Sequence, residues 1–71
     1  RAGQGYQVNK PSLELIGKQG FAKTALRPSG KIDIDGVWYD AVSNDGFIDS
    51  GVPIVVNKIE NYNVIVKRLN S

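Results

Sequence analysis

The residues best suited to metal binding or proton transfer are five aspartates between positions 33 and 49. Asp33 and Asp35 lie two positions apart, so they would share one face of a strand. Asn44, Asp45 and Asp49 fall together in the stretch "NDGFIDS". A hard cation needs several oxygens that converge from a loop at a defined spacing, and this stretch lacks both the spacing and the terminal Glu of an EF-hand. We therefore interpret these residues as turn formers and expect no metal and no cofactor.

Three serines could act as nucleophiles if a neighbouring lysine served as their base. The candidates are Ser29, Ser43 and Ser50, and the available bases are Lys23 and Lys31. The chain contains no His, which is the commonest general base. A Ser–Lys pair also needs a third group to orient it, and no spacing in the sequence marks such a group. We expect this chain not to be an enzyme.

The length of the chain limits where any function can lie. Its 71 residues make one domain, and a domain of this size has little room for an internal cavity. Six of the nine basic side chains precede residue 32, whereas six of the seven acidic ones lie between residues 32 and 60. In an antiparallel sheet such blocks place opposite charges on neighbouring strands. We therefore interpret the charges as cross-strand pairs on a solvated surface.

The composition of the chain changes near residue 12. Residues 1–12 ("RAGQGYQVNKPS") show no apolar period and are rich in turn formers, which predicts a tail or linker. Residues 13–71 carry strand-like patterns and are predicted to form the folded domain. No apolar run approaches the ~18 residues that a membrane helix needs, and no signal peptide is recognisable. Because the first residue is Arg rather than Met, we expect the chain to be a piece of a longer protein.

Strand-like stretches alternate with turn signals along residues 13–69. The first stretch, residues 13–26, is predicted as one long strand bent at its glycines. Pro28-Ser29-Gly30 predicts a type I turn in which the glycine takes the left-handed conformation and closes a three-residue hairpin. Asp35-Gly36 predicts a two-residue hairpin turn, since both positions favour positive φ. The fourth and fifth strands are expected at residues 52–60 and 64–69.

The Asp35-Gly36 turn also sets the register of the hairpin around it. With this turn, one face of the hairpin is predicted to be core: Ile32, Ile34, Val37, Tyr39 and Ala41. The opposite face is predicted to point outward, with Lys31 across from Asp40 and Asp33 across from Trp38. A four-residue loop would instead set Asp33 against Asp40. Both registers leave Trp38 outside.

Residues 43–51 ("SNDGFIDSG") predict a loop in which Phe47-Ile48 folds back on the core as a plug. Five short strands, Gly-rich corners and no helical period indicate an all-β fold, and specifically a small five-stranded OB-like Greek-key barrel. Closure into a barrel would remove the edges that such apolar strands otherwise expose.

Many OB-folds bind single-stranded nucleic acid or oligosaccharides on the outer face of strands 2 and 3. In this sequence that face carries one aromatic residue, Trp38, with Asp33, Asp35 and Asp40 around it. Carboxylates repel phosphate, so we expect no nucleic acid partner. Binding of single-stranded nucleic acid or of an oligosaccharide remains the alternative function.

An outward Trp38 has two interpretations. The loop at 43–51 or the N-terminal residues could cover it, or it could contact a partner, since Trp and Arg are enriched at binding hot spots. Arg27, beside the Pro-Ser-Gly turn, could equally be solvated or paired with an Asp. Our hypothesis for a partner-contact surface comprises Trp38, Asp33, Asp40, Arg27 and Phe47.

The order of these turn signals resembles that of one protein family. The chain carries a glycine pair at Gly17 and Gly20, then "AKTALRPSG", "IDIDG", "YDA", "GFI" and "GVP". In this order the motifs resemble the soluble C-terminal domain of the NfeD-like proteins, over residues 13 to about 69. Trp38 stands where a polar or charged residue would be expected, which supports an outward position for its side chain.

That resemblance implies an OB-fold barrel anchored to a membrane by spans that precede it, and we expect the cytoplasmic face. It implies a non-catalytic interaction module whose partner is a stomatin- or prohibitin-like membrane protein, with self-association as a further expectation. Longer family members carry an upstream serine protease region with a Ser–Lys dyad, so an accessory role to a membrane-bound protease is another alternative. Nothing in this chain matches that region, and no catalytic residue carries over.

Overall fold

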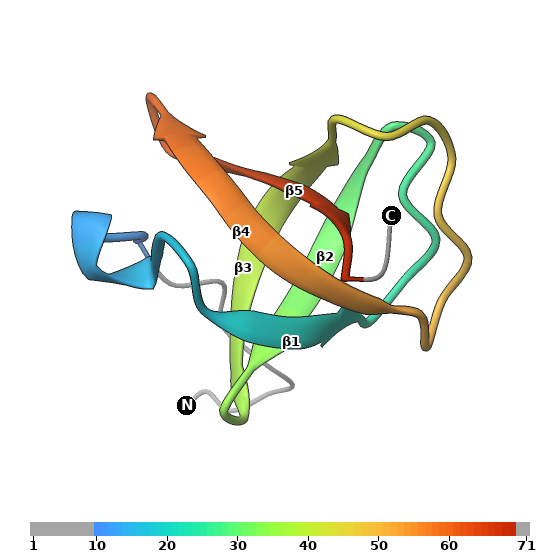
Figure 1. Ribbon diagram of the computed structural model, residues 1–71, viewed down its shortest axis with the longest axis horizontal. Helices are drawn as coiled ribbons and strands as arrows, with labels where there is room; N and C mark the ends of the chain where they lie inside the picture. The colour runs from blue at the N-terminus through green and yellow to red at the C-terminus, as the bar shows by residue number, and fades with distance from the viewer. Residues whose placement is uncertain (1–9, 70–71) are drawn as a thin grey trace, which may run out of the picture.

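Five strands between Gln19 and Arg68 close into a barrel (Figure 1). The structure is a computed structural model that describes residues 10–69. Its elements are a short 3-10 helix, η1 (Leu13–Leu15), and the strands β1 (Gln19–Ala22), β2 (Ser29–Ile34), β3 (Val37–Ser43), β4 (Pro53–Glu60) and β5 (Asn63–Arg68). β4 begins one residue later than predicted, and β5 begins and ends one residue earlier than predicted.

The strand order around the barrel is β1-β2-β3-β5-β4, and β4 returns to β1. The β3–β5 pairing is parallel, and the other four pairings are antiparallel. This crossover makes a Greek-key order, and five such strands form an OB-like barrel. The predicted fold class is confirmed.

The β2–β3 hairpin has the predicted register. Asp35 and Gly36 have φ angles of 55° and 83°, as a two-residue turn of this kind requires. Ile34 lies across from Val37, and the alternating positions follow from there along both strands. Lys31 lies across from Asp40, with its Nζ 2.7 Å from the carboxylate. The two-residue turn is confirmed, and the four-residue alternative is wrong.

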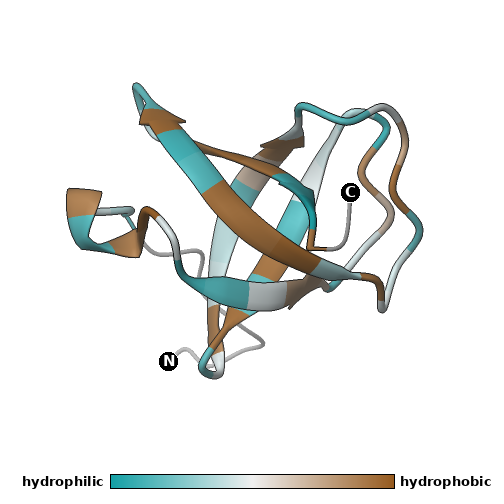
Figure 2. Ribbon diagram, in the orientation of Figure 1, coloured by the Kyte–Doolittle hydropathy of each residue, from teal (hydrophilic) through white to brown (hydrophobic). Residues whose placement is uncertain are grey.

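Apolar side chains from all five strands, η1 and two loops fill the barrel. Hydrophobic and hydrophilic segments alternate along the strand ribbons (Figure 2). Ile32, Ile34 and Ala41 are buried as predicted. Val37 and Tyr39 are half-buried, so the prediction that they are core residues is wrong in degree, although Tyr39 packs against the core. The reason is that β5 pairs with the last three residues of β3, and these two side chains lie beyond that pairing.

The long first strand predicted for residues 13–26 is wrong. Its start forms η1 and a turn at Gly17, whose N–H donates to the carbonyl oxygen of Val56 at 2.9 Å, and this places Leu15 in the core. The strand itself is limited to β1. A Cβ at Gly20 would lie 2.1 Å from the carbonyl oxygen of Asp33, so the glycine permits a close approach of β1 to β2.

The hairpin turn predicted at Pro28-Ser29-Gly30 is also wrong. Ser29 and Gly30 already belong to β2, and Gly30 does not have a positive φ. A Cβ at Gly30 would lie 2.5 Å from the carbonyl oxygen of Ala25, because the chain that enters β2 crosses over this position. Glycine is therefore needed here for space, and the reversal runs through residues 23–28.

The plug predicted at Phe47-Ile48 is half right. Ile48 is fully buried, whereas the side chain of Phe47 is 66% exposed. Ile48 forms an antiparallel bridge with Leu26, in which the two N–H···O hydrogen bonds measure 2.7 and 3.0 Å. Side chains alternate along extended chain, so burying Ile48 turns Phe47 outward. The bridge holds the loops 23–28 and 44–52 side by side at one end of the barrel (Figure 1).

The tail predicted at residues 1–12 lies mostly outside the described residues. Residues 10–12 belong to no helix or strand. The boundary of the domain at residue 13 stays a prediction.

Ile34→Ala is expected to destabilise the barrel by about 2–5 kcal/mol, because it leaves a cavity beneath a side chain that is 3% exposed. Chemical denaturation of the isolated chain measures the loss. Ile16→Ala is the matched control, since Ile16 is 48% exposed and its truncation should change stability by about 0.5 kcal/mol or less. Equal losses in the two variants would contradict a core built around Ile34.

Candidate partner-contact surfaces

The five residues of the contact hypothesis belong to two different parts of the fold. Asp33, Trp38 and Asp40 lie on the outward side of the β2–β3 hairpin. Arg27 and Phe47 lie on the two loops that the Leu26–Ile48 bridge joins. The structure therefore presents two candidate surfaces, with different environments for their aromatic residues.

The indole of Trp38 is held by contacts within its own chain. Its Nε1–H donates to one carboxylate oxygen of Asp33 at 3.1 Å, and the other oxygen accepts the N–H of Gly36 at 2.9 Å. One carboxylate thus connects the hairpin turn to the outer face of β3. The Nζ of Lys23 lies 4.8 Å from the centre of the indole ring, a cation–π contact. Trp38 is half-buried as a result.

The contact between Lys23 and Trp38 was not predicted from the sequence. It adds a positive charge beside the indole. Lys23 lies fifteen residues earlier in the sequence, and the β1–β2 pairing brings the chain after β1 alongside β2. Its N–H donates to the carbonyl oxygen of Lys31 at 2.9 Å. Two lysines therefore share this face with Asp33 and Asp40, so the face is mixed in charge rather than acidic.

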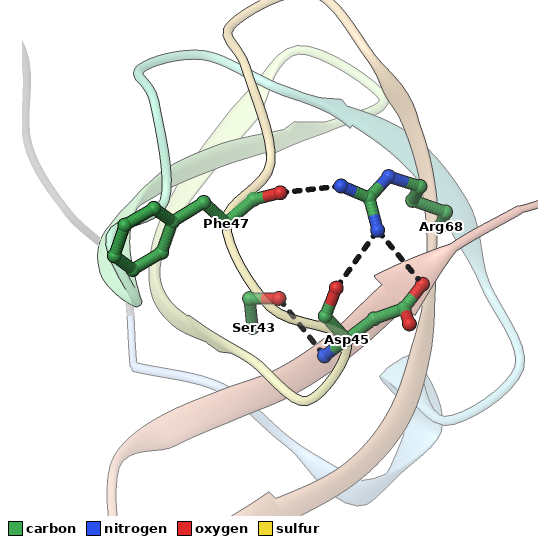
Figure 3. Close-up of polar contacts among 4 residues, drawn as sticks. All are labelled: Ser43, Asp45, Phe47 and Arg68. Carbon is green, nitrogen blue, oxygen red and sulfur yellow. Dashed lines mark hydrogen bonds and ion pairs between the residues drawn. The ribbon is translucent and has the colours of Figure 1, made fainter.

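The loop after β3 is held by one arginine at the end of β5 (Figure 3). The Nη1 of Arg68 donates to the carbonyl oxygen of Asp45 at 2.8 Å and lies 3.2 Å from its carboxylate. The Nη2 donates to the carbonyl oxygen of Phe47. At the start of the same loop, the hydroxyl of Ser43 accepts the N–H of Asp45 at 3.0 Å. Arg68 was not singled out from the sequence, because no local motif marks its contacts with this loop.

Arg27 and Phe47 are both exposed, and each is the sequence neighbour of a residue that pairs between the two loops. Arg27 follows Leu26 in one loop and Phe47 precedes Ile48 in the other, so both residues adjoin the antiparallel bridge. Within residues 10–69, the guanidinium of Arg27 makes no ion pair or side-chain hydrogen bond. This pair therefore combines an apolar ring and a charge that both face solvent.

Two of the residues suited to metal binding or catalysis, Asp45 and Ser43, have structural roles in this loop. The carboxylate and carbonyl oxygens of Asp45 are engaged by Arg68, and Ser43 is buried with its hydroxyl in the turn. Across residues 10–69 no group of three or more His, Cys, Asp and Glu side chains is placed to hold a metal ion.

The fold and these surfaces define a small OB-like barrel domain that presents aromatic and charged groups on its exterior. The chain belongs to the NfeD-like family: its residues 12–68 match the model of the NfeD-like C-terminal, partner-binding domain. The family resemblance noted from the motifs is confirmed.

Two relatives agree with this assignment. The membrane protein NfeD1b of Bacillus subtilis (strain 168) is 35% identical over 65 residues, which cover 92% of this chain. The chain spans about 15% of the length of that relative. Among solved structures, the C-terminal domain of stomatin operon partner protein 1510-C from Pyrococcus horikoshii is 32% identical, with a TM-score of 0.74. That match covers 78% of this chain and 88% of the other.

No helix within residues 10–69 has the length and apolar character needed to cross a membrane.

Trp38→Ala is expected to lower the free energy of unfolding by about 1–3 kcal/mol, because it removes the hydrogen bond to Asp33 and the contact with Lys23. Phe21→Ala is a suitable control. Phe21 lies across from Asp33 in the same cross-strand row and is 40% exposed, so its truncation should cost less. Denaturant titrations compare the variants. An unchanged unfolding midpoint for Trp38→Ala would show that the indole does not stabilise the fold and would favour its role in partner contact.

Proposed function

We propose that this domain is a non-catalytic protein-interaction module and that its partner is a stomatin- or prohibitin-like membrane protein. The observation that carries the proposal is the match of residues 12–68 to a domain described as partner-binding. The name of the Pyrococcus horikoshii protein, a stomatin operon partner, supports the choice of partner class.

The packing of the barrel supports a function on its surface. The interior is filled by side chains that are almost completely buried, among them Ile32, Ile54 and Val64. Residues 13–15 and the two paired loops also contribute side chains to this core. A small ligand would have to displace these side chains to enter, whereas a protein partner can bind the exterior without disturbing them.

The parent protein is a further part of the proposal. The B. subtilis relative is named a membrane protein, which supports a membrane-anchored parent for this domain. Its cytoplasmic orientation, its self-association and an accessory role beside a protease stay predictions, since the chain matches a small part of that relative.

The direct test uses a stomatin-like protein from the organism that encodes this chain. That protein is purified and reconstituted in lipid nanodiscs. The 71-residue chain is expected to bind these nanodiscs saturably in a surface-based binding assay. An unrelated OB-type barrel of similar size and net charge serves as the control, together with empty nanodiscs. Equal retention of the two barrels, or equal binding to empty nanodiscs, would reject the proposed partner.

Specific binding to short single-stranded DNA or RNA is not expected at physiological salt. Lys23 lies over the ring of Trp38, the aromatic residue on the β2–β3 face, and Asp33 and Asp40 lie beside it. A base would have to displace the lysine to stack on this ring. An NMR titration with an oligonucleotide tests the expectation. Saturable shifts confined to β2 and β3 at micromolar concentration would favour the nucleic acid alternative.

A further inference from the structure

We propose that Phe47 and Arg27 together form the anchor of the partner-binding surface, and that the partner presents an apolar pocket bordered by a carboxylate. This inference rests on the proposed function, because it names the surface and the chemistry through which the domain would bind its partner. It concerns the end of the barrel where the loops 23–28 and 44–52 are paired.

The backbone that carries Phe47 is fixed on both sides. The next residue, Ile48, is fully buried and makes two backbone hydrogen bonds with Leu26. The carbonyl oxygen of Phe47 itself accepts a hydrogen bond from Arg68, which also binds Asp45 two residues earlier. A binding group on a backbone that is already ordered loses little conformational entropy when a partner binds. The loop is therefore pre-organised for contact.

The ring of Phe47 points away from the contacts that hold its backbone (Figure 3). Its side chain is 66% exposed, and within residues 10–69 it makes no cation–π contact. Trp38 and Tyr62 differ in this respect. The ring of Trp38 is half-buried beneath Lys23, and Lys10 lies 5.3 Å from the ring centre of Tyr62. Aromatic residues, Phe among them, are enriched at protein interfaces, and a pre-ordered backbone lowers the entropic cost of binding.

The charge of Arg27 defines the complementary group on the partner. Arg27 and Phe47 each adjoin a residue of the Leu26–Ile48 bridge, so a partner surface that covers the ring would also reach the guanidinium. Removing a charged group from water is costly unless an opposite charge meets it. Asp49 follows Ile48 in the other loop, and it forms no ion pair with Arg27. The carboxylate must therefore come from the partner, beside the pocket that receives the ring.

Two pairs of variants test the surface in the nanodisc binding assay. Phe47→Ala and Arg27→Glu are each expected to weaken binding by about tenfold or more, as truncation or reversal at a hot spot does. Tyr62→Ala is the control for the aromatic residue, since Tyr62 is also 66% exposed. Lys18→Glu is the control for the charge, since Lys18 is exposed and precedes β1. Both controls should bind like the wild-type chain, and thermal unfolding should show that all four variants are folded.

Photo-cross-linking separates failure of the surface from failure of the proposed partner. A photoreactive amino acid replaces Phe47 in one chain and Tyr62 in another, and membranes of the source organism are irradiated with each. The expected result is a cross-link from position 47 to a membrane protein. Mass spectrometry should place the cross-linked site next to acidic residues of that protein, and Arg27→Glu should abolish the cross-link. Cross-linking from position 62 and not from 47 would overturn the proposed surface. Absence of nanodisc binding combined with a specific cross-link from 47 would reject the stomatin-like partner and retain the surface.

Discussion

The backbone bridge between Leu26 and Ile48 is the contact on which one whole end of this barrel depends. Both residues are fully buried in the core, although they come from loops outside the five strands. Once the bridge has formed, the alternation of extended chain decides which neighbouring residues face solvent. Packing of the core therefore also determines which residues this end of the barrel displays, and Arg68 holds the displayed loop from the last strand.

Features set by neighbouring residues could be predicted from the sequence. The turn at Asp35-Gly36 depends on the φ preferences of two residues, and the register of β2 and β3 follows from it. The glycines at positions 20 and 30 were misinterpreted because residues that are not adjacent to them in the sequence set their requirements. Each is needed because another part of the backbone passes close by, at Asp33 and Ala25 respectively. A local pattern does not distinguish a glycine required for space from one required for a turn.

In the candidate site too, local features could be predicted, whereas contacts between distant parts of the chain could not. The outward direction of Trp38 and its position across from Asp33 followed from the hairpin register. Its contact with Lys23 required the pairing of a different strand, and the contacts of Arg68 with the β3–β4 loop required closure of the barrel. No spacing in the sequence signals either contact, because the groups come together through tertiary structure. The motif order indicated the family, whereas single residue types did not indicate a function.

The surfaces around Trp38 and Phe47 differ in whether the aromatic side chain takes part in contacts that stabilise the fold. Asp33 already accepts the hydrogen bond of the Trp38 indole N–H, and Lys23 already lies over its ring. A partner would have to compete with these contacts. At Phe47 the polar contacts are made by the backbone, and the ring takes no part in them. A partner can therefore cover that ring without breaking any interaction that maintains the fold. Burial of apolar area then contributes to binding without a compensating loss within the domain. By this argument, the loop end is better suited to reversible association than the strand face on which many OB-folds bind their ligands.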